Sequence, residues 1–332
     1  MTLPRARLHV GVAVALALAL GFLAGGCGGL DPTNPAAGGG GGGGTPLTPG
    51  AYGVPVQGFP SWHERVLLVL TNAVRMGPLD WRTRYAADFS PSLASARALE
   101  AYPAVGPIRW NAGLAQAARA HSEDMARTPC FSHDSCDGTS WATRIRSYYS
   151  LSGSIGENIA AGPSDPRHAM NLWLCDASGG SCCADGASCD GHRRNMMNGG
   201  WRALGTGHAY VSGAPYGHYW TQDFGGASDL AEPPLVDGSH LAVGAETVFL
   251  ANWSAAAPPR SIAVVVDGAA TPLALDLGTA ARGTWSARTP RGTACRSYHL
   301  QAVDVDGGSW RVPATGEYRT FGEGSCAEDY RP

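Results

Sequence analysis

The sequence predicts an α+β fold, in which a domain of mixed helices and strands is followed by an all-β domain. Apolar residues recur at helical spacing in two long segments, 62–76 and 110–126. Beyond residue 234, short β-rich runs are separated by Gly, Pro and Asp. A chain of 332 residues is also too long for one ordinary core. We therefore expect an α+β domain over residues 61–227 and an immunoglobulin-like β-sandwich over residues 235–332.

The α+β domain is expected to contain helices first and a β-hairpin last. Val66, Leu70 and Val74 share one face of the first helical segment, which Gly77 ends. Asn111 is a natural N-cap for the second helix. Further helices are expected to begin near Ser140, Asp165 and Asp190, and strands are expected at 203–211 and 216–224.

The C-terminal region shows strand patterns throughout. Residues 297–313 alternate apolar and polar side chains around a turn at Gly307-Gly308. No motif in this region carries recognisable chemistry, so its expected role is spacing or adhesion. The expected strands are 245–252, 261–266, 284–287, 298–305 and 309–312.

The N-terminus has the pattern of an export signal. Arg5 and Arg7 precede an apolar run from Val10 to Ala24, which is shorter than the roughly 20 residues that a membrane-spanning helix needs. The run ends in LAGGC, which resembles the cleavage box of bacterial lipoproteins and predicts residues 1–27 as a signal ending at a lipidated Cys27. Ala24 departs from that box, where Leu is common. Simple secretion and an uncleaved anchor are the alternatives.

Residues 28–60 are expected to form a disordered tether. Prolines and a run of seven glycines, Gly38 to Gly44, leave nothing that could bury a core. A tether after a lipidated Cys27 would hold a folded head away from a membrane. The sequence therefore predicts a protein of the bacterial cell envelope, attached to the outer membrane or the cell surface.

The cysteines predict disulfide bonds. Without Cys27, eight of the nine cysteines remain, an even number in a chain with an export signal. Cys130 and Cys136 flank a short loop and could pair, and Cys295 and Cys326 are expected to pair. The pairing of the other four stays open, with a zinc knot as an alternative that their spacing does not favour. These four are Cys175, Cys182, Cys183 and Cys189.

The charge composition argues against nucleic acid as a partner. Only 15% of the residues are charged and the formal net charge is −3. A protein that binds nucleic acid needs a basic face to contact phosphates. We therefore expect no nucleic acid among the partners, whereas the predicted lipidation of Cys27 makes a membrane an expected partner.

Six stretches in the first domain together resemble one family. In chain order they are LLVLTNAVR at 67–75, WNAGLAQAARAHSEDMA at 110–126, FSH at 131–133, GENIA at 156–160, GHRRNMM at 191–197 and YWTQDFG at 219–225. They resemble the CAP superfamily, also called the SCP-like extracellular domain. The resemblance implies an α-β-α sandwich in an exported and often disulfide-bonded protein. It also implies lipid or sterol binding rather than a demonstrated catalytic activity.

The resemblance also implies a cleft with two histidines and two acidic residues. Carried over by motif, these are His133, Glu157 and His192, with Asp176 in the place of a second glutamate. Two imidazoles with carboxylates could hold a divalent cation such as Zn²⁺, with His133 and His192 as its ligands. Without a metal, Glu157 would hold one of the histidines by a hydrogen bond. A buried polar network that fixes loop packing is the alternative interpretation.

Three functions follow for this cleft. The first is binding of a lipid-like or other small ligand, with or without a divalent metal. The second is a metal-dependent hydrolase of peptide or cell-wall bonds, with Glu157 as its base. The third is a structural or adhesive envelope protein without catalysis.

Other polar residues near these motifs are given structural roles. His121 lies on the apolar face of its helix and is expected to be a core histidine. Asn158 is expected to hydrogen-bond to backbone. Arg193 and Arg194 are expected to be solvated.

Overall fold

The computed structural model of the chain describes residues 53–85, 98–176, 182–229 and 232–332. The signal segment predicted for 1–27, its lipidation site Cys27 and most of the predicted tether lie outside these residues. Among the described residues, no helix combines the length and the apolar character that crossing a membrane would require.

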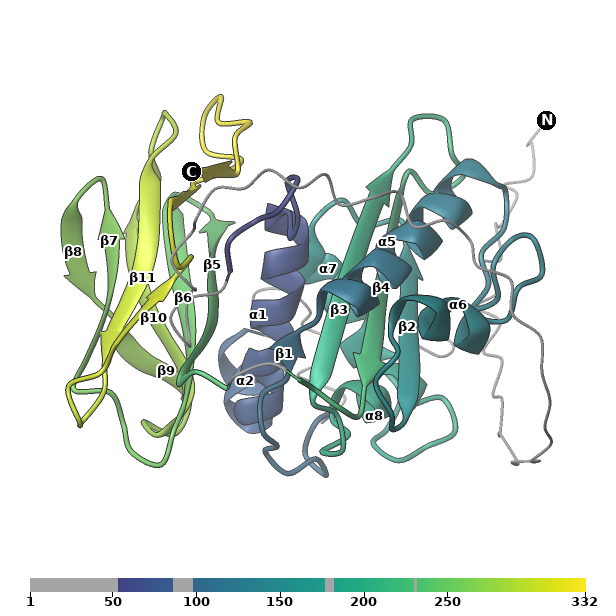
Figure 1. Cartoon of the computed structure of the whole chain (residues 1–332), viewed down its shortest axis with the longest axis horizontal. Coiled ribbons are helices and arrows are strands. Elements are labelled where there is room, and N and C mark those ends of the chain that lie inside the picture. Colours follow the sequence, from purple (N-terminus) through teal and green to yellow (C-terminus); the bar gives the residue numbers. More distant parts are fainter. Residues whose placement is uncertain (1–52, 86–97, 177–181, 230–231) are drawn as a thin grey trace, which may run out of the picture. The chain divides into compact units, whose positions relative to one another are not determined.

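A four-stranded mixed sheet forms the centre of the first part (Figure 1). Its order is β1-β3-β4-β2, in which β1 runs parallel to β3 and the other pairs are antiparallel. The motif GENIA falls in β2, a strand that the sequence analysis does not predict because Gly, Glu and Asn are poor strand formers. The bounds are β1 Arg109–Trp110, β2 Ile155–Ala161, β3 Ala203–Tyr210 and β4 His218–Gly225.

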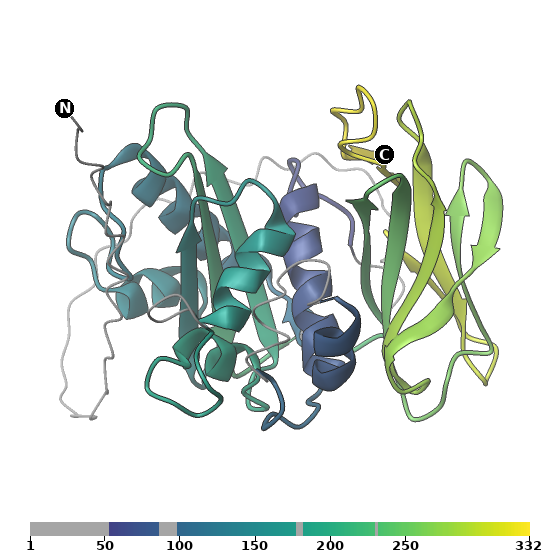
Figure 2. The ribbon, with the colours of Figure 1, turned by 180° about the vertical axis from the view of Figure 1, so that it is seen from behind.

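Helices cover both faces of this sheet (Figures 1 and 2). Helix α5 lies against β3 and β4, with α6 beside it, and α1, α7 and α8 lie on the other face. A side chain at Gly205 or Gly207 would collide with the backbone of α5, so these glycines let the helix approach the sheet closely. The bounds are α1 Trp62–Met76, α2 Pro78–Arg84, α5 Ala112–Arg127, α6 Trp141–Tyr148, α7 Pro166–Cys175 and α8 Gly191–Met196.

The helix boundaries follow capping residues that the sequence displays. Ser61 and Glu64 form a capping box at the start of α1. Asn111 and Ser140 accept hydrogen bonds from backbone N–H groups in the first turns of α5 and α6. Gly77 ends α1 as expected, but the chain then enters α2 directly, because a proline is well suited to the first turn of a new helix.

The C-terminal region forms two further sheets. The first is β5-β6-β10-β9, and the second is β14-β13-β11-β7-β8 with β12 paired to β11. Strand β5 follows directly on the expected linker and is not predicted from sequence. The bounds are β5 Leu235–Val243, β6 Glu246–Ser254, β7 Ser261–Val266, β8 Ala269–Pro272, β9 Ala274–Gly278, β10 Arg282–Pro290, β11 Ser297–Val303, β12 Ser309–Val312, β13 Glu317–Arg319 and β14 Tyr330–Arg331.

The strand β6 is buried on both faces, and its two sets of side chains enter different cores. Phe249 and Trp253 join the core between the two C-terminal sheets. Val248 and Leu250, which point the other way, join the core that contains α1. The described residues belong to one compact unit, Leu47–Pro332, in which α1 is packed between two sheets. The α+β fold with a C-terminal β-sandwich is thereby confirmed.

A buried polar network joins α1 to β5 and β6. Asn72 donates to the Asp237 carboxylate at 2.7 Å, and Asn252 donates to its other oxygen at 2.6 Å. Asn252 also donates to the carbonyl of Val69 in α1 at 2.9 Å. Burial raises the pKa of Asp237 to about 6, although both amide donors oppose that rise. The contact between the helix and the sheet is therefore specific as well as apolar.

The predicted disulfides are present. Cys130–Cys136 and Cys295–Cys326 form as expected. The insertion after α7 has two bridges between near neighbours, Cys175–Cys182 and Cys183–Cys189. The four pairs fit an exported protein, because cytosolic thiols are normally kept reduced.

Residues 53–60, at the end of the segment predicted as a tether, contact both parts of the fold. The Tyr318 hydroxyl donates to the carbonyl of Gly53, and Arg119 of α5 lies 4.0 Å from the ring centre of Phe59. The Arg65 guanidinium donates to the carbonyl of Pro60 at 2.7 Å. This short segment therefore lies against the surface of the protein, with residues 56–59 still exposed to solvent.

Candidate functional site

The first predicted histidine is held by the predicted glutamate. His133, in the loop after α5, places Nδ1 2.8 Å from Oε1 of Glu157 on β2. The Glu157 side chain is 2% exposed, whereas that of His133 is 36% exposed. A buried carboxylate beside an imidazole nitrogen favours the tautomer in which that nitrogen carries the proton. The other ring nitrogen, Nε2, is then an acceptor at a partly exposed position.

Arg144 of α6 completes this pair. Its guanidinium donates to Oε2 of Glu157, and to the carbonyl of His133 at 3.0 Å. Burial by itself would raise the pKa of Glu157, but the hydrogen bond with His133 and the charges nearby outweigh it and hold the pKa below its ordinary value. Glu157 is therefore ionised, with a partner on each oxygen.

Two further titratable groups lie near Glu157. Asp223 faces it across the β2–β4 pair and is completely buried. Burial, with the charge of Glu157 added, raises the pKa of Asp223 well above its ordinary value and thus favours the neutral form of this carboxyl. His121 is buried as expected, with Nε2 2.9 Å from the carbonyl of Ser132. Successive side chains of a strand point to opposite faces, so Asp223 and Trp220 lie on opposite faces of β4. This alternation could have suggested Asp223 as a residue near Glu157.

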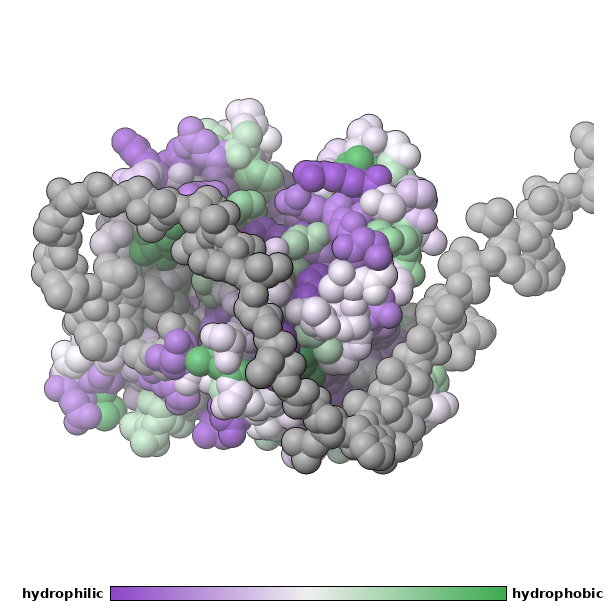
Figure 3. Space-filling view, turned by 45° about the vertical axis from the view of Figure 1, so that its right-hand side comes forward, coloured by the Kyte–Doolittle hydropathy of each residue, from purple (hydrophilic) through white to green (hydrophobic). Residues whose placement is uncertain are grey.

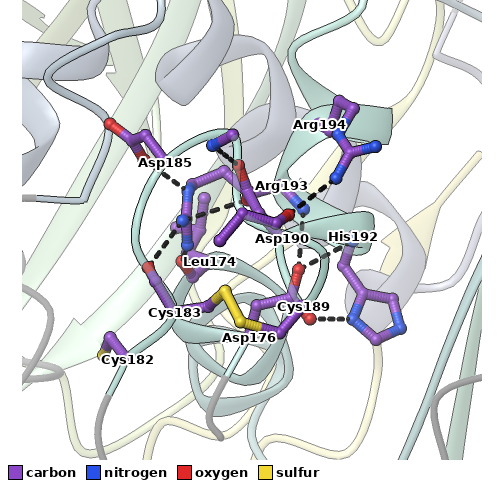
Figure 4. Close-up of polar contacts among 12 residues, drawn as sticks. Leu174, Asp176, Cys182, Cys183, Asp185, Cys189, Asp190, His192, Arg193 and Arg194 are labelled. Atoms are coloured by element: carbon purple, nitrogen blue, oxygen red, sulfur yellow. Dashed lines mark hydrogen bonds and ion pairs between the residues drawn. A yellow bond between two sulfur atoms is a disulfide. The ribbon is translucent and has the colours of Figure 1, made fainter.

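The second predicted histidine has a carboxylate of its own. Nδ1 of His192 lies 2.5 Å from Oδ1 of Asp176, and its backbone N–H donates to Oδ2 at 2.8 Å (Figure 4). The side chain of Asp176 is 6% exposed and that of His192 is 26% exposed. Asp176 ends α7 in the left-handed conformation, with φ 49° and ψ 52°. The shorter acid therefore reaches the histidine from a helix end.

The two pairs are connected through asparagines. Asn158, next to Glu157, donates to the carbonyl of His192 at 3.3 Å. Asn195, on α8, donates to the carbonyl of Glu157 and to the side-chain oxygen of Asn158, both at 3.1 Å. The expectation that Asn158 bonds to backbone is confirmed. These bonds tie the helix that carries His192 to the strand that carries Glu157.

Arg193 is not solvated, which corrects the sequence-based expectation. Its side chain is completely buried and pairs with Asp185 and Asp190 (Figure 4). The expectation failed because two adjacent arginines in a short helix give no sign of which one faces inward. Arg194 does bond at an exposed position, to the carbonyl of Ala187 at 2.9 Å.

Glu157 and Asp176 are placed to orient histidines that could bind a metal. The two carboxylates are not themselves placed as metal ligands. Glu157 and Asp176 each bond an Nδ1 atom, so the atoms left for a cation are the two Nε2 atoms. Over the described ranges, no group of three or more His, Cys, Asp or Glu side chains is arranged to hold a metal ion. A closed zinc site needs four ligands, so these residues do not form one.

A surface hollow of about 440 Å³ is lined by residues such as Trp62, Arg167 and Phe321, and by neither histidine of the two pairs. Figure 3 shows hydrophilic and hydrophobic residues interspersed on the face it presents, outside the grey atoms.

An α-β-α sandwich with disulfides and two histidine–carboxylate pairs defines the class of exported CAP-type domains. Residues 69–224 match the model of the family described as "CAP: Cysteine-rich secretory protein family". Residues 69–224 are thereby identified as a CAP domain, and the match covers just under half of the chain. The family and the four disulfides together indicate an exported protein.

One curated relative and two solved structures can be compared with the chain. The uncharacterized protein YkwD of Bacillus subtilis strain 168 is 30% identical over 118 residues, which cover 36% of this chain and 39% of that protein. This chain therefore spans well under half the length of that relative.

The solved structures are more distant. An extracellular protein with an SCP domain from Bacillus anthracis is 26% identical, with 49% of this chain and 40% of that chain covered and a TM-score of 0.32. Venom allergen-like protein 4 of Schistosoma mansoni is 17% identical, with 52% and 97% covered and a TM-score of 0.31. TM-scores this low add no argument of their own.

Proposed function

We propose that this exported CAP-domain protein binds a small ligand, lipid-like or otherwise, on the surface that carries His133 and His192. One observation supports the proposal: each imidazole is partly exposed while its Nδ1 atom is held by a buried carboxylate. A histidine that serves packing alone gains nothing from leaving one ring nitrogen near solvent. Here two Nε2 atoms are held in place for a group that comes from outside the chain.

The chemistry of the ligand follows from these atoms. A neutral imidazole that donates through Nδ1 offers an acceptor at Nε2, which suits a hydroxyl group. If the carboxylate stabilises the protonated ring, Nε2 becomes a donor, which suits a carbonyl or an anionic oxygen. A polar headgroup on an apolar body would fit such a pair at a surface.

Titration with ligand probes tests this proposal. The whole chain, incubated with sterol and with phospholipid vesicles, should retain one of these probes. The variant His133→Ala/His192→Ala should lose that retention, and His168→Ala, a histidine of α7 outside the site, should keep it. Equal retention by wild type and the double variant would overturn the proposal, and no retention by either would favour a structural role.

A zinc titration tests the metal-dependent alternative. Two imidazole nitrogens without a third protein ligand predict weak binding, which a calorimeter would detect only at high zinc concentration. Tight zinc binding that is lost in His133→Ala/His192→Ala would instead support a metal site. A hydrolase would also need Glu157 as a base, and both of its oxygens are already bonded to Arg144 and His133.

The membrane attachment is a separate proposal. The LAGGC box and the apolar run before it favour lipidation of Cys27, which would place the domain at the surface of the cell envelope. Cys27→Ser should move the protein from the membrane fraction to the soluble fraction. Unchanged fractionation would reject lipidation without affecting the ligand proposal.

A further inference from the structure

The insertion after α7 is organised around one buried guanidinium. Arg193 Nε donates to Asp185 at 2.9 Å, and Nη2 lies 3.0 Å from an oxygen of Asp190 without hydrogen-bond alignment. Its Nη1 donates to the carbonyl of Leu174, and Nη2 donates to that of Cys183 at 2.8 Å. One side chain thereby joins the end of α7, the insertion and the start of α8 (Figure 4).

The end of α7 that Arg193 holds is also the end that carries Asp176. Leu174 and Cys175 directly precede Asp176, whose left-handed backbone turns its carboxylate back toward α8. There it accepts from both the ring and the backbone nitrogen of His192. Leu174 lies two residues before Asp176, and Arg193 directly follows His192. The bond from Arg193 to Leu174 therefore joins the chain segments on both sides of the Asp176–His192 pair.

Two disulfides close the insertion into short rings. Cys175–Cys182 fixes the residue before Asp176, and Cys183–Cys189 fixes the residue before Asp190. The two rings are adjacent in sequence, because Cys182 and Cys183 are consecutive. The backbone N–H of Cys183 also donates to the carbonyl of Cys175 at 2.9 Å.

The same carboxylates attach the insertion to a second segment. Asp185 accepts from the backbone N–H groups of Leu99 and Ala101, both at 2.9 Å. Asp190 accepts from the Tyr102 hydroxyl. With Arg193 absent, both acids would stay in place without their buried counter-charge, which is a strongly unfavourable arrangement.

We propose that Arg193 is a positioning residue for His192, acting with the two insertion disulfides through the end of α7 and Asp176. Arg193 does not touch the ligand surface itself. Its role is to hold Asp176 where that carboxylate fixes the ring of His192. This inference rests on the proposed function only in treating His192 as a group that meets the ligand.

Nitrogen-15 NMR of the imidazole rings tests the inference without any ligand. In wild type, both histidines should show the tautomer with the proton on Nδ1. In Arg193→Gln, His192 should change to a mixture of tautomers, while His133 keeps its spectrum. Arg194→Gln, one residue further along α8, should leave both rings unchanged. Arg193→Lys should fall between wild type and Arg193→Gln, because it keeps the charge but not the forked geometry.

Two results would overturn the inference. One is an unchanged His192 spectrum in folded Arg193→Gln. The other is an equal change in both histidines, which would mean a general loss of structure. Because these spectra need no ligand, a failure of the proposed function would leave this result readable.

A second variant decides the matter if Arg193→Gln does not fold. Cys175→Ala/Cys182→Ala should alter the His192 ring alone, and the matched pair Cys295→Ala/Cys326→Ala in the β-sandwich should alter neither ring. If the Cys175/Cys182 variant folds with His192 unchanged, the inference is wrong. Zinc then serves as a probe. If wild type binds zinc, folded variants with an altered His192 spectrum should bind it about 10- to 100-fold more weakly.

Discussion

The two histidine–carboxylate pairs have similar geometry but are supported in different ways. Glu157 belongs to β2, an edge strand of the central sheet, and has Arg144 directly on its carboxylate. Asp176 lies at the end of α7. The side chain of the nearby Arg193 bonds to backbone carbonyls and to other acids instead of the Asp176 carboxylate. The first pair therefore depends on strand register and on a charge in contact, and the second depends on covalent bridges and on a loop. The comparison shows that two similar histidine–carboxylate pairs can be held by different means, one by strand register and a contacting charge, the other by covalent bridges.

The largest expected effect comes from removing the charge in contact. Arg144→Met should lower the free energy of unfolding by about 3–5 kcal/mol, because it removes the buried counter-charge of Glu157 and leaves only the hydrogen bond with His133. Arg146→Met, on the exposed side of the same helix, should cost about 1 kcal/mol or less. Chemical denaturation of both variants measures the difference. Similar losses in the two variants would mean that Glu157 does not depend on Arg144.

The next effect distinguishes the two carboxylates by pH. A glutamate with a lowered folded-state pKa stabilises the protein above its ordinary pKa, and that stabilisation is lost as the pH falls through the folded value. Glu157→Gln should therefore cost about 2–3 kcal/mol at pH 7, and less as the pH is lowered from 5 to 3.

Asp176→Asn provides the matched control for that experiment. Asparagine tolerates the left-handed backbone and keeps an acceptor, so the expected loss at pH 7 is about 1 kcal/mol. Denaturation curves collected between pH 3 and pH 7 measure both variants. A Glu157→Gln loss that stays constant across this range would contradict the ionised state assigned to Glu157.

The smallest effect is expected at the buried acid beneath the first pair. Asp223→Asn should change the free energy of unfolding by less than about 1 kcal/mol at pH 7, because asparagine has nearly the shape of a protonated carboxyl group. Thermal and chemical denaturation measure this change. A loss above about 2 kcal/mol would show that Asp223 carries a charge in the folded protein.

Much of the first domain could be predicted because its information is local. Capping residues at Ser140 and Asn111 and apolar spacing in 62–76 are visible within a few turns of chain. The site residues, by contrast, were found by resemblance. Spacing alone could not pair His133 with Glu157, because the two residues meet only after a helix and a strand have packed. Arg193 was misjudged for the same reason.

The sequence by itself determined most helix boundaries, about half of the strands and the cysteines available for bridges, and through a family resemblance it identified the residues of the two histidine–carboxylate pairs. These depend on side-chain periodicity and on backbone preferences, which act over a few residues. Tertiary structure alone decided that α1 lies between two sheets, that each histidine has its own carboxylate and that Arg193 is buried. Each of these depends on which distant surfaces exclude water together, and that is a property of the packed chain rather than of any segment of it.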